Sequence, residues 1–542
     1  MKYLIIPIIL IAAIFRFYGL DWDSGFHLHP DERMITMVAG KISFLDLNPH
    51  FFAYGSLPLY LLKTTGTFLG IFNPEFAYYA KINLAGRALS TLFDIGTLIV
   101  LYFLAKKVFD QKVALLSAFF YGVAVLPIQL SHFYAVDTSL TFFIMLTLFL
   151  LVRHLENPKS QNILFVSVSF GLALATKTSA ILLAVPIGMT ILLKFSPRRI
   201  PLILLIPPIT LIVFFIFEPF AFLDFKNFWL QTMQQQQMTR DAFTFPYTLQ
   251  YVDIIPYLYE LKNIFLWGLG PALAVLSFAG VILVTFQALA KIKLASQDST
   301  LQGYNIILLS FFWIYLGVTG SFAVGWMRYM LPLYPLLCLF AAFFFNSLIT
   351  KIKKYLNFNT FLNYTLYAIL YTLLLIWPLA FVQIYSEPNT RVQATTWINQ
   401  NILPGQTLAI EHWDDGLPLL NMQNYRILTL PLYDFDTVQK WSNINQILSQ
   451  TDYIIIASNR LYTPLQKLTD CENLPAGRCY RETTQYYQKL FDGSLGFSKV
   501  AEFSVFPGLG IKNWKLEIDD SSSDESFTVY DHPKVMIFKK NL

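Results

Sequence analysis

The chain has 542 residues, of which 55% are hydrophobic and only 13% are charged, and its mean hydropathy is +0.50. Soluble domains carry roughly 25% charged residues, so this composition is that of a membrane protein. The formal net charge of +5 is small for this length and offers no basic stripe to neutralise the phosphates of a nucleic acid. We therefore expect an integral membrane protein that has no nucleic-acid partner.

Apolar stretches recur along the first two thirds of the chain. A membrane-spanning helix needs about 20 mostly apolar residues. Eleven mostly apolar stretches of about this length lie near residues 3–20, 84–104, 113–130, 138–152, 162–176, 178–193, 200–217, 264–287, 303–321, 329–350 and 362–384. The two stretches around Lys177 are short, which leaves a re-entrant hairpin open as the alternative to two spans. The fold class expected is a polytopic α-helical membrane protein with about eleven transmembrane helices.

Lys and Arg in the short connections predict the orientation, because cytoplasmic loops carry them in excess. With a cytoplasmic N-terminus every inner connection is basic, namely Lys106-Lys107, 153–159, 194–199, 291–293 and 351–354. Three longer segments then lie outside: a first outer loop over 21–83 with amphipathic helices, a flap-like loop over 218–262, and residues 386–542. The first stretch has no small-residue cleavage site after it. We expect it to stay as a span, in a prokaryotic plasma membrane.

The C-terminal part is a different kind of sequence. A helical pattern over 393–402 stops at Pro404-Gly405, and TLAIEHW (407–413), DYIIIAS (452–458) and FTVY (527–530) are typical of strands. We expect an extracytoplasmic α/β domain over 386–542, after a transmembrane domain over 1–385. Cys471 and Cys479 lie within it, and either a disulfide or two free thiols fits the sequence.

Ionisable residues at the edges of the apolar stretches are the main functional signal. Such residues are costly in a membrane, so each is a candidate for function. On the predicted topology they lie toward the outer face: Arg16, Asp31, Glu32, Arg87, Asp94, His132, Asp137, Lys177, Glu218 and Arg328. The pattern predicts one polar cavity that opens outside and contains several carboxylates and several cations.

This mixture of charges suits transfer of a sugar from a polyprenyl-phosphate donor. Arg and Lys at outer helix ends can hold the lipid phosphate by charge-assisted hydrogen bonds. A nearby carboxylate can deprotonate the acceptor as it attacks the anomeric carbon through an oxocarbenium-like transition state. A polyprenyl-linked glycan flippase or transporter is the alternative, since it also needs a cationic phosphate site. A membrane scaffold without activity is a third reading, but it gives no reason to bury several charges.

Several motifs, in this order, resemble one group of enzymes. They are HPDE (29–32), YGSLPLYL (54–61), GRALSTLFD (86–94), SHFYAVDTSLTFF (131–143), ATKTSA (175–180), LWGLGP (266–271) and RYMLPLYP (328–335). The chain over about 1–385 resembles the protein O-mannosyltransferase and aminoarabinose-transferase (ArnT-like) group of the GT-C superfamily. The resemblance implies an inverting glycosyltransferase that uses a polyprenyl-phosphate sugar donor. The acceptor implied is a protein hydroxyl, a lipid or a glycan.

The resemblance also implies roles for single residues. Asp31 is the expected general base, Glu32 positions the acceptor or a cation, and Asp137 is the second acidic residue. The resemblance makes Arg87, Lys177 and Arg328 candidates for binding the lipid phosphate. We also expect Arg16, His132, Glu218 and Tyr329 to bind the lipid phosphate or the substrate. An N-terminal helix cap is the other explanation of Asp31 and Glu32.

A divalent metal ion is left open as a cofactor. His29, His132, Asp31 and Asp137 are the residues that offer suitable ligands, although no HxxxH or CxxC spacing supports a site. The sequence shows no β-trefoil insertion of the kind that eukaryotic protein mannosyltransferases carry, so the acceptor need not be a protein. The sugar, the acceptor and the oligomeric state are not predicted.

Overall fold

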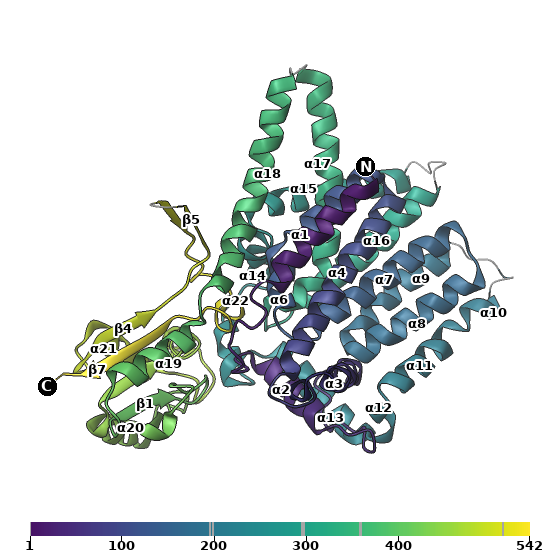
Figure 1. Cartoon of the computed structure of the whole chain (residues 1–542). Coiled ribbons are helices and arrows are strands. Elements are labelled where there is room, and N and C mark those ends of the chain that lie inside the picture. The colour runs from purple at the N-terminus through teal and green to yellow at the C-terminus, as the bar shows by residue number, and fades with distance from the viewer. Residues whose placement is uncertain are drawn as a thin grey trace. The chain divides into compact units, whose positions relative to one another are not determined.

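A computed structural model describes residues 2–193, 197, 200–293, 299–356, 360–511 and 514–541, and its helices and strands are drawn in Figure 1. The chain forms two compact units. Unit 1 comprises Met1–Leu20, Pro30–Gln235 and Pro256–Leu379, and unit 2 comprises Asp21–His29, Gln236–Ile255 and Ala380–Leu542. Unit 2 therefore takes two short segments from the expected outer loops in addition to the C-terminal part. The functional division of the chain at residue 385 stays a prediction.

Unit 1 is helical. Its elements are η1 (Lys2–Leu4), α1 (Ile5–Phe17), α2 (Pro30–Lys41), α3 (Ser56–Gly70), η2 (Pro74–Ala77), α4 (Ile82–Val108), α5 (Gln111–Gly122), α6 (Val125–Ser131), α7 (Asp137–Glu156), α8 (Ser160–Thr176), η3 (Thr178–Leu183), α9 (Ala184–Leu193), α10 (Ile200–Ile203), α11 (Ile206–Phe217), α12 (Phe220–Leu223), α13 (Phe225–Arg240), α14 (Leu258–Asn263), the π-helix η6 (Ile264–Gly268), α15 (Pro271–Lys293), α16 (Ser299–Thr319), η7 (Met327–Leu333), α17 (Tyr334–Leu356) and α18 (Thr360–Val382).

Helices cover all eleven apolar stretches. In the described part of the chain, seven are long and apolar enough to cross a membrane: Ile82–Val108, Asp137–Glu156, Ile200–Phe217, Pro271–Ala290, Gln302–Thr319, Met327–Lys353 and Ala368–Asn401. The pair α5 and α6, bent by 56°, is an eighth candidate, and Ile5–Phe17, Ser160–Thr176 and Thr178–Leu193 are shorter apolar helices. A polytopic helical membrane fold is therefore confirmed. The number of eleven spans and the orientation stay predictions, and the expected basic loop 194–199 lies, except for residue 197, outside the described residues.

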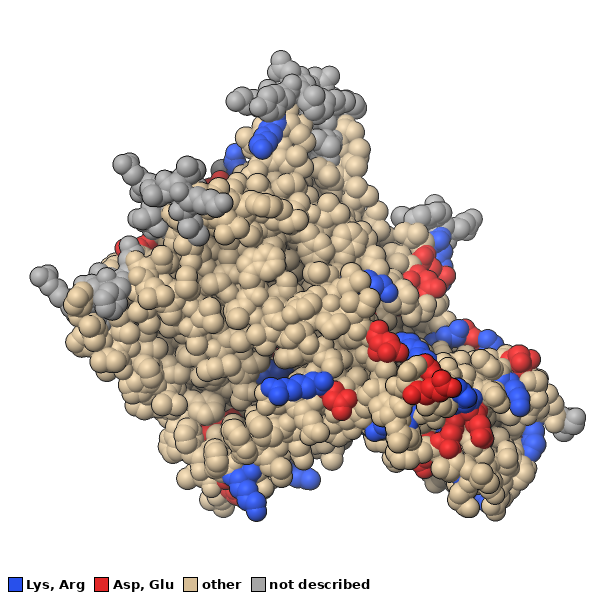
Figure 2. Space-filling view, turned by 180° about the vertical axis from the view of Figure 1, so that it is seen from behind, with Lys and Arg blue, Asp and Glu red and all other residues tan. Residues whose placement is uncertain are grey.

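Several of these helices present apolar side chains outward. On α11, Leu211, Ile212 and Ile216 each leave more than half of their surface exposed. Figure 2 shows a broad face of the molecule with hardly any charged side chain among the residues that it colours. Apolar exposure on this scale is unfavourable in water and is typical of a surface that contacts lipid.

The helices of unit 1 pack through a few extensive interfaces. The helix α4 packs against α5 and α7, α8 packs against α7 and α11, and α17 packs against α15 and α5. The interface of α15 with α17 is close, because a Cβ atom added at Gly280 would lie 2.2 Å from the carbonyl oxygen of Phe340. Small residues allow such close approach between helices in membranes.

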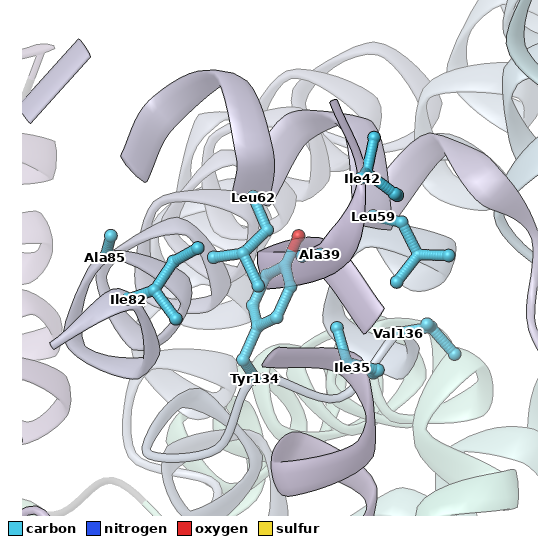
Figure 3. Packing of buried hydrophobic residues seen from close by; sticks show 9 residues of the cluster. All are labelled: Ile35, Ala39, Ile42, Leu59, Leu62, Ile82, Ala85, Tyr134 and Val136. Carbon is cyan, nitrogen blue, oxygen red and sulfur yellow. The ribbon is translucent and has the colours of Figure 1, made fainter. Parts of the chain in front are cut away.

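A hydrophobic cluster fixes the first loop to the helices behind it, as Figure 3 shows. It combines side chains from α2, α3, the start of α4 and the segment before α7: Ile35, Ala39, Ile42, Leu59, Leu62, Ile82, Ala85, Tyr134 and Val136. All are nearly inaccessible to solvent. The first loop is thus a packed layer, and the start of α2 has a defined place.

Unit 2 is built on a mixed sheet. The five-stranded sheet has the order β2-β1-β3-β7-β4, in which β1 pairs in parallel with β2 and β3, and β7 pairs antiparallel with β3 and β4. The strands are β1 (Thr407–Glu411), β2 (Arg426–Leu430), β3 (Tyr453–Ile456), β4 (Phe497–Phe503) and β7 (Val535–Lys540), with a separate hairpin of β5 (Gly508–Ile511) and β6 (Trp514–Glu517). The helical elements are η5 (Pro246–Tyr251), η8 (Gln383–Ser386), α19 (Thr390–Asn401), η9 (Met422–Asn424), α20 (Val438–Gln450), η10 (Leu465–Lys467), α21 (Arg481–Asp492) and α22 (Glu525–Thr528).

Two of the three strands that the sequence predicts for this unit are present in the structure. The stretches 407–413 and 452–458 contain β1 and β3. The proposed strand at 527–530 is wrong, because Glu525–Thr528 forms α22 instead. The side chain of Asp524 accepts the backbone N–H of Ser526 at 2.8 Å and so caps this helix.

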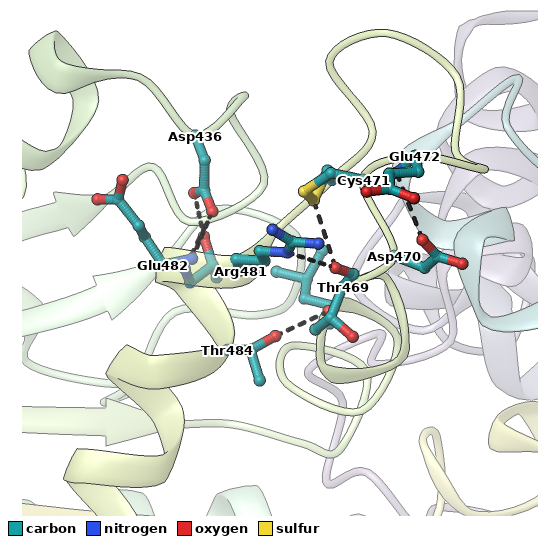
Figure 4. Close-up of a disulfide and its surroundings, with 11 residues drawn as sticks. Asp436, Thr469, Asp470, Cys471, Glu472, Arg481, Glu482 and Thr484 are labelled. Carbon is teal, nitrogen blue, oxygen red and sulfur yellow. Dashed lines mark hydrogen bonds between the residues drawn. A yellow bond between two sulfur atoms is a disulfide. The ribbon is translucent and has the colours of Figure 1, made fainter.

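Cys471 and Cys479 form a disulfide, so the alternative of two free thiols is excluded in this structure. Figure 4 shows the bridge and its surroundings. Beside it, Arg481 Nε donates to the carbonyl oxygen of Thr469 at 2.8 Å, and Asp436 Oδ2 accepts the backbone N–H of Glu482 at 2.9 Å. The bridge and these hydrogen bonds hold the loop that leads into α21.

Replacing Leu62 by Ala should lower the stability of the folded chain. Leu62 has no exposed surface, and truncating a buried Leu costs about 2–5 kcal/mol because a cavity remains. We expect a lower thermal unfolding midpoint for the purified variant in detergent. The matched control is Leu45→Ala, since Leu45 lies in the same loop and is fully exposed. Equal midpoints for the two variants would contradict the packed layer.

Candidate functional site

Eight of the ten ionisable residues singled out in the sequence form four carboxylate–cation pairs within unit 1. Two pairs have no exposed side-chain surface, and these are Arg16–Asp94 and Arg87–Glu32. The other two are partly exposed, and these are Arg328–Asp31 and Lys177–Asp137. Exposure therefore divides the charges into a buried group and an accessible group.

Arg16 is held entirely by the protein. Its Nε donates to Asp94 Oδ2 at 2.5 Å, and its Nη1 and Nη2 donate to the carbonyl oxygens of Gly122 and Tyr121 at 2.8 and 3.2 Å. Asp94 also accepts the hydroxyl of Tyr121. A buried ion pair needs such additional hydrogen bonds to offset its desolvation. The geometry favours a structural role in joining α1, α4 and α5.

Arg87 and Glu32 form the second buried pair. Arg87 on α4 donates from Nη2 and Nε to the two oxygens of Glu32 at 2.6 and 3.0 Å, and from Nη1 to the carbonyl oxygen of Leu20 at 2.8 Å. Glu32 also accepts the backbone N–H of Tyr134 at 2.8 Å. This pair fixes the first turn of α2 against α4 and the segment before α7.

Asp31 lies beside Glu32 in that first turn but has accessible surface. Its side chain is 23% exposed, and it forms an ion pair with Nη1 of Arg328, whose side chain is 12% exposed. Tyr54 donates its hydroxyl to the other oxygen of Asp31 at 2.8 Å. Nε of Arg328 is buried and has no hydrogen-bond partner in the described part of the chain. One donor of this guanidinium is therefore available next to the carboxylate.

The second accessible pair joins two helix ends. Asp137 is the first residue of α7, and Lys177 directly follows α8, so each charge lies at the helix end whose dipole stabilises it. Lys177 Nζ lies 2.9 Å from Asp137 Oδ1. It also lies 4.5 Å from the ring centroid of Tyr329, and the guanidinium carbon of Arg328 lies 5.7 Å from the same centroid. The ring of Tyr329 thus connects the two accessible pairs.

Gly55 and Glu218 place the first loop on this site. The N–H of Gly55 donates to the carbonyl oxygen of Thr176 at 3.1 Å, and a Cβ atom at Gly55 would lie 1.9 Å from the carbonyl oxygen of Ala175. Glu218, at the end of α11, accepts both the backbone N–H and the hydroxyl of Ser56. Burial raises the pKa of Glu218 to about 7, although the hydrogen bonds from Ser56 oppose this rise. Glu218 therefore acts on the start of α3 and not on an open surface.

His132 is inside the protein. Its Nδ1 lies 2.9 Å from the carbonyl oxygen of Ile128, and its Nε2 lies 2.8 Å from that of Tyr18. Both ring nitrogens thus face backbone acceptors and not an open cavity. The contacts favour a role in fixing α6 near the end of α1.

The residues expected to bind a metal do not form a ligand set. In the described ranges of the chain, no group of three or more His, Cys, Asp or Glu side chains is arranged to hold a metal ion. Asp137 pairs with Lys177 and Asp31 with Arg328.

Tyr54 belongs to the site, although it was not among the residues expected from the sequence. Burial raises the pKa of its hydroxyl well above the usual value, and the adjacent charge of Asp31 raises it further. Tyr54 therefore remains a hydrogen-bond donor to Asp31 at neutral pH. Its place in YGSLPLYL was a signal in the sequence, since this motif was part of the family resemblance.

Comparisons with known proteins agree with this architecture. The family model described as dolichyl-phosphate-mannose-protein mannosyltransferase matches residues 80–222. An oligosaccharyltransferase structure from Archaeoglobus fulgidus, tethered with an acceptor peptide, has a TM-score of 0.53 at 12% identity and covers 96% of this chain and 74% of that chain. The archaeal oligosaccharyltransferase AglB from the same organism, with an inhibitory peptide and a dolichol-phosphate, has a TM-score of 0.52 at 13% identity and covers 99% and 88%.

The chain has the fold of the GT-C superfamily of glycosyltransferases. ArnT from Cupriavidus metallidurans in the apo state aligns with a TM-score of 0.48 at 11% identity, over 86% of this chain and 94% of that chain. None of the curated proteins matches the sequence. The matched residues 80–222 include Arg87, Asp137 and Lys177, whereas Asp31 and Arg328 lie outside them.

Glu32→Gln and Asp31→Asn should differ sharply in stability. The first change removes a carboxylate that pairs with the buried Arg87, and breaking a buried ion pair costs about 3–5 kcal/mol. The second acts on a pair whose side chains keep 12% and 23% of their surface exposed, so water compensates part of the loss and we expect a smaller cost. Thermal unfolding of both purified variants should show a large decrease for Glu32→Gln and a small change for Asp31→Asn. The reverse order would contradict the division into buried and accessible pairs.

Proposed function

We propose that the chain transfers a sugar from a polyprenyl-phosphate donor to an acceptor at the outer face of the membrane. The observation that carries the proposal is the accessible pair of Asp31 and Arg328, in which a carboxylate lies beside a guanidinium whose Nε has no hydrogen-bond partner among the described residues. The GT-C fold supports it, since AglB of the same fold was solved with a dolichol-phosphate. The N-terminus is then cytoplasmic and the sheet of unit 2 extracytoplasmic.

The cations of the site hold the donor phosphate in this proposal. Arg328 offers Nε, and Lys177 reaches the same region across the ring of Tyr329. A phosphate that enters between them competes with the two carboxylates for these cations. Charge-assisted hydrogen bonds to phosphate are about twice as strong as neutral ones. Donor binding thus weakens the hold of Arg328 on Asp31.

Asp31 is then the general base. It accepts the proton of the acceptor hydroxyl while the acceptor oxygen forms a bond to the anomeric carbon and the bond from that carbon to the phosphate oxygen breaks. The polyprenyl phosphate leaves with both electrons of the broken bond, and the cations stabilise the negative charge that develops on it. A single displacement of this kind inverts the anomeric configuration.

The buried ion pairs hold the residues of the site in position. Glu32 orients the first turn of α2 through Arg87, so that Asp31 faces Arg328 and Tyr54. Arg16 and Arg87 are therefore positioning residues in this proposal, and Asp137 orients Lys177. The acceptor is a protein hydroxyl, a lipid or a glycan.

Asp31→Asn should abolish transfer because the amide cannot accept the proton. General-base catalysis contributes typically 10²–10⁴-fold, so we expect a decrease in rate of roughly that size. The assay supplies radiolabelled polyprenyl-phosphate sugars to the purified chain and measures release of free polyprenyl phosphate. Asp46→Asn is the control, since Asp46 is exposed in the same loop. Normal transfer by the Asp31 variant, with its fold intact, would exclude Asp31 as the base.

Lys177→Gln should weaken donor binding more than it slows the bound complex. Loss of one charged hydrogen bond of about 1.5–3 kcal/mol raises the donor KM roughly 10- to 100-fold. The same assay, run over a range of donor concentrations, separates KM from kcat. Lys41→Gln is the control, because Lys41 is exposed at the end of α2. An unchanged donor KM in Lys177→Gln would remove Lys177 from the phosphate site.

A further inference from the structure

Unit 2 contains a cavity that the transfer reaction does not use. It has a volume of about 400 Å³ and lies where the parallel strands β1 and β2 end, and its lining includes Glu411, Trp413, Pro431, Tyr433, Asp434 and Asn443. Ligands of open α/β sheets bind outside the carboxyl ends of parallel strands. Cavities of roughly 300–1,000 Å³ hold small molecules.

A second cavity of about 570 Å³ shares the lining residues Pro431, Tyr433, Asp434 and Asn443 with the first. Both cavities therefore border the segment between the end of β2 and the start of α20.

Lys440 fixes the wall that both cavities share. It is 6% exposed, and its Nζ donates to the carbonyl oxygens of Leu432 and Asp434 at 2.9 and 2.8 Å. It also donates to Asp436 Oδ1 at 2.8 Å and to Thr483 Oγ1 at 2.6 Å. The loop is thus ordered before any ligand binds, which lowers the entropic cost of binding.

Glu411 supplies a buried polar atom that lacks a partner. Its side chain lines the first cavity and it is 4% exposed. Oε2 accepts the hydroxyl of Tyr487 at 2.7 Å, whereas Oε1 has no hydrogen-bond partner among the residues that the structure describes. A buried polar atom without a partner costs about 1–3 kcal/mol, and a ligand hydroxyl would satisfy it.

The lining determines the chemical class of the ligand. Neither Lys nor Arg lines the first cavity, so it does not suit a phosphate or a carboxylate. Burial raises the pKa of Glu411 to about 8, so this group is mostly neutral at pH 7. Trp413 and Tyr433 present rings whose centroids lie 6.3 Å apart at 63°, and aromatic rings with polar groups around them suit a ligand that has both apolar faces and hydroxyls.

We propose that this cavity, bounded by Trp413, Glu411 and Asn443, binds a sugar ring of a glycan. A sugar ring has an apolar face for Trp413, and its hydroxyls pair with Glu411, Asp434 and Asn443. The site lies wholly within unit 2. It is a binding site and does not depend on the proposed transfer reaction.

The test uses the purified full chain in detergent and a panel of methyl glycosides of common hexoses, with saturation-transfer NMR and titration calorimetry. At least one glycoside should bind saturably. Trp413→Ala should weaken that binding about tenfold or more through loss of the ring contact. Asn443→Ala should weaken it about two- to tenfold, as expected for one hydrogen bond.

Asn443→Ala also tests the proposal if Trp413→Ala fails to fold. Asn443 is exposed on α20, so its truncation leaves the core intact. The matched control is Asn445→Ala, since Asn445 is exposed on the same helix and lines neither cavity. Binding by that control should stay at the wild-type level, and Asp31→Asn should bind the glycoside normally while losing transfer. The proposal is overturned if no glycoside saturates the wild-type chain, or if the Trp413 and Asn443 variants bind as tightly as the control.

Discussion

The ion pair between Glu32 and Arg87 is the constraint on which the candidate site depends. Both side chains are completely buried, and a charge in such a place is tolerated only when a countercharge and further hydrogen bonds compensate for lost hydration. The pair therefore fixes the rotation of α2 on α4. Because neighbouring residues of a helix point in different directions, Asp31 then faces away from Arg87 and meets Arg328.

The same physical rule separates the roles of the charged residues. Arg16 and Arg87 have their guanidinium groups engaged with protein acceptors and no exposed surface, so they hold helices together. Arg328 and Lys177 keep some exposed surface, and each forms an ion pair with a carboxylate and lies near the ring of Tyr329. A ligand can compete for these two cations without breaking the fold. Separate residues can thus maintain the structure and carry out the chemistry.

Sequence reasoning was successful where one strong local signal decided the structure. Each apolar stretch is mostly helical, although some are divided into two helices, and β1 and β3 were visible as runs of buried residues. It failed at 527–530, where β-branched and aromatic residues suggested a strand. There the Asp524 cap favours one helical turn. Local preference in four residues is too weak to oppose a cap and tertiary packing.

The sequence by itself determined that the chain is a membrane protein with few acidic and basic residues. The lengths of the apolar stretches and the number of charged residues do not depend on tertiary structure. It also indicated Asp31, Lys177 and Arg328. Only the tertiary structure decided which carboxylate meets which cation, and that Tyr54 joins the site. Pairing depends on how helices distant in the sequence pack, and residues alone do not reveal whether a charge is sealed inside a protein or open to a ligand.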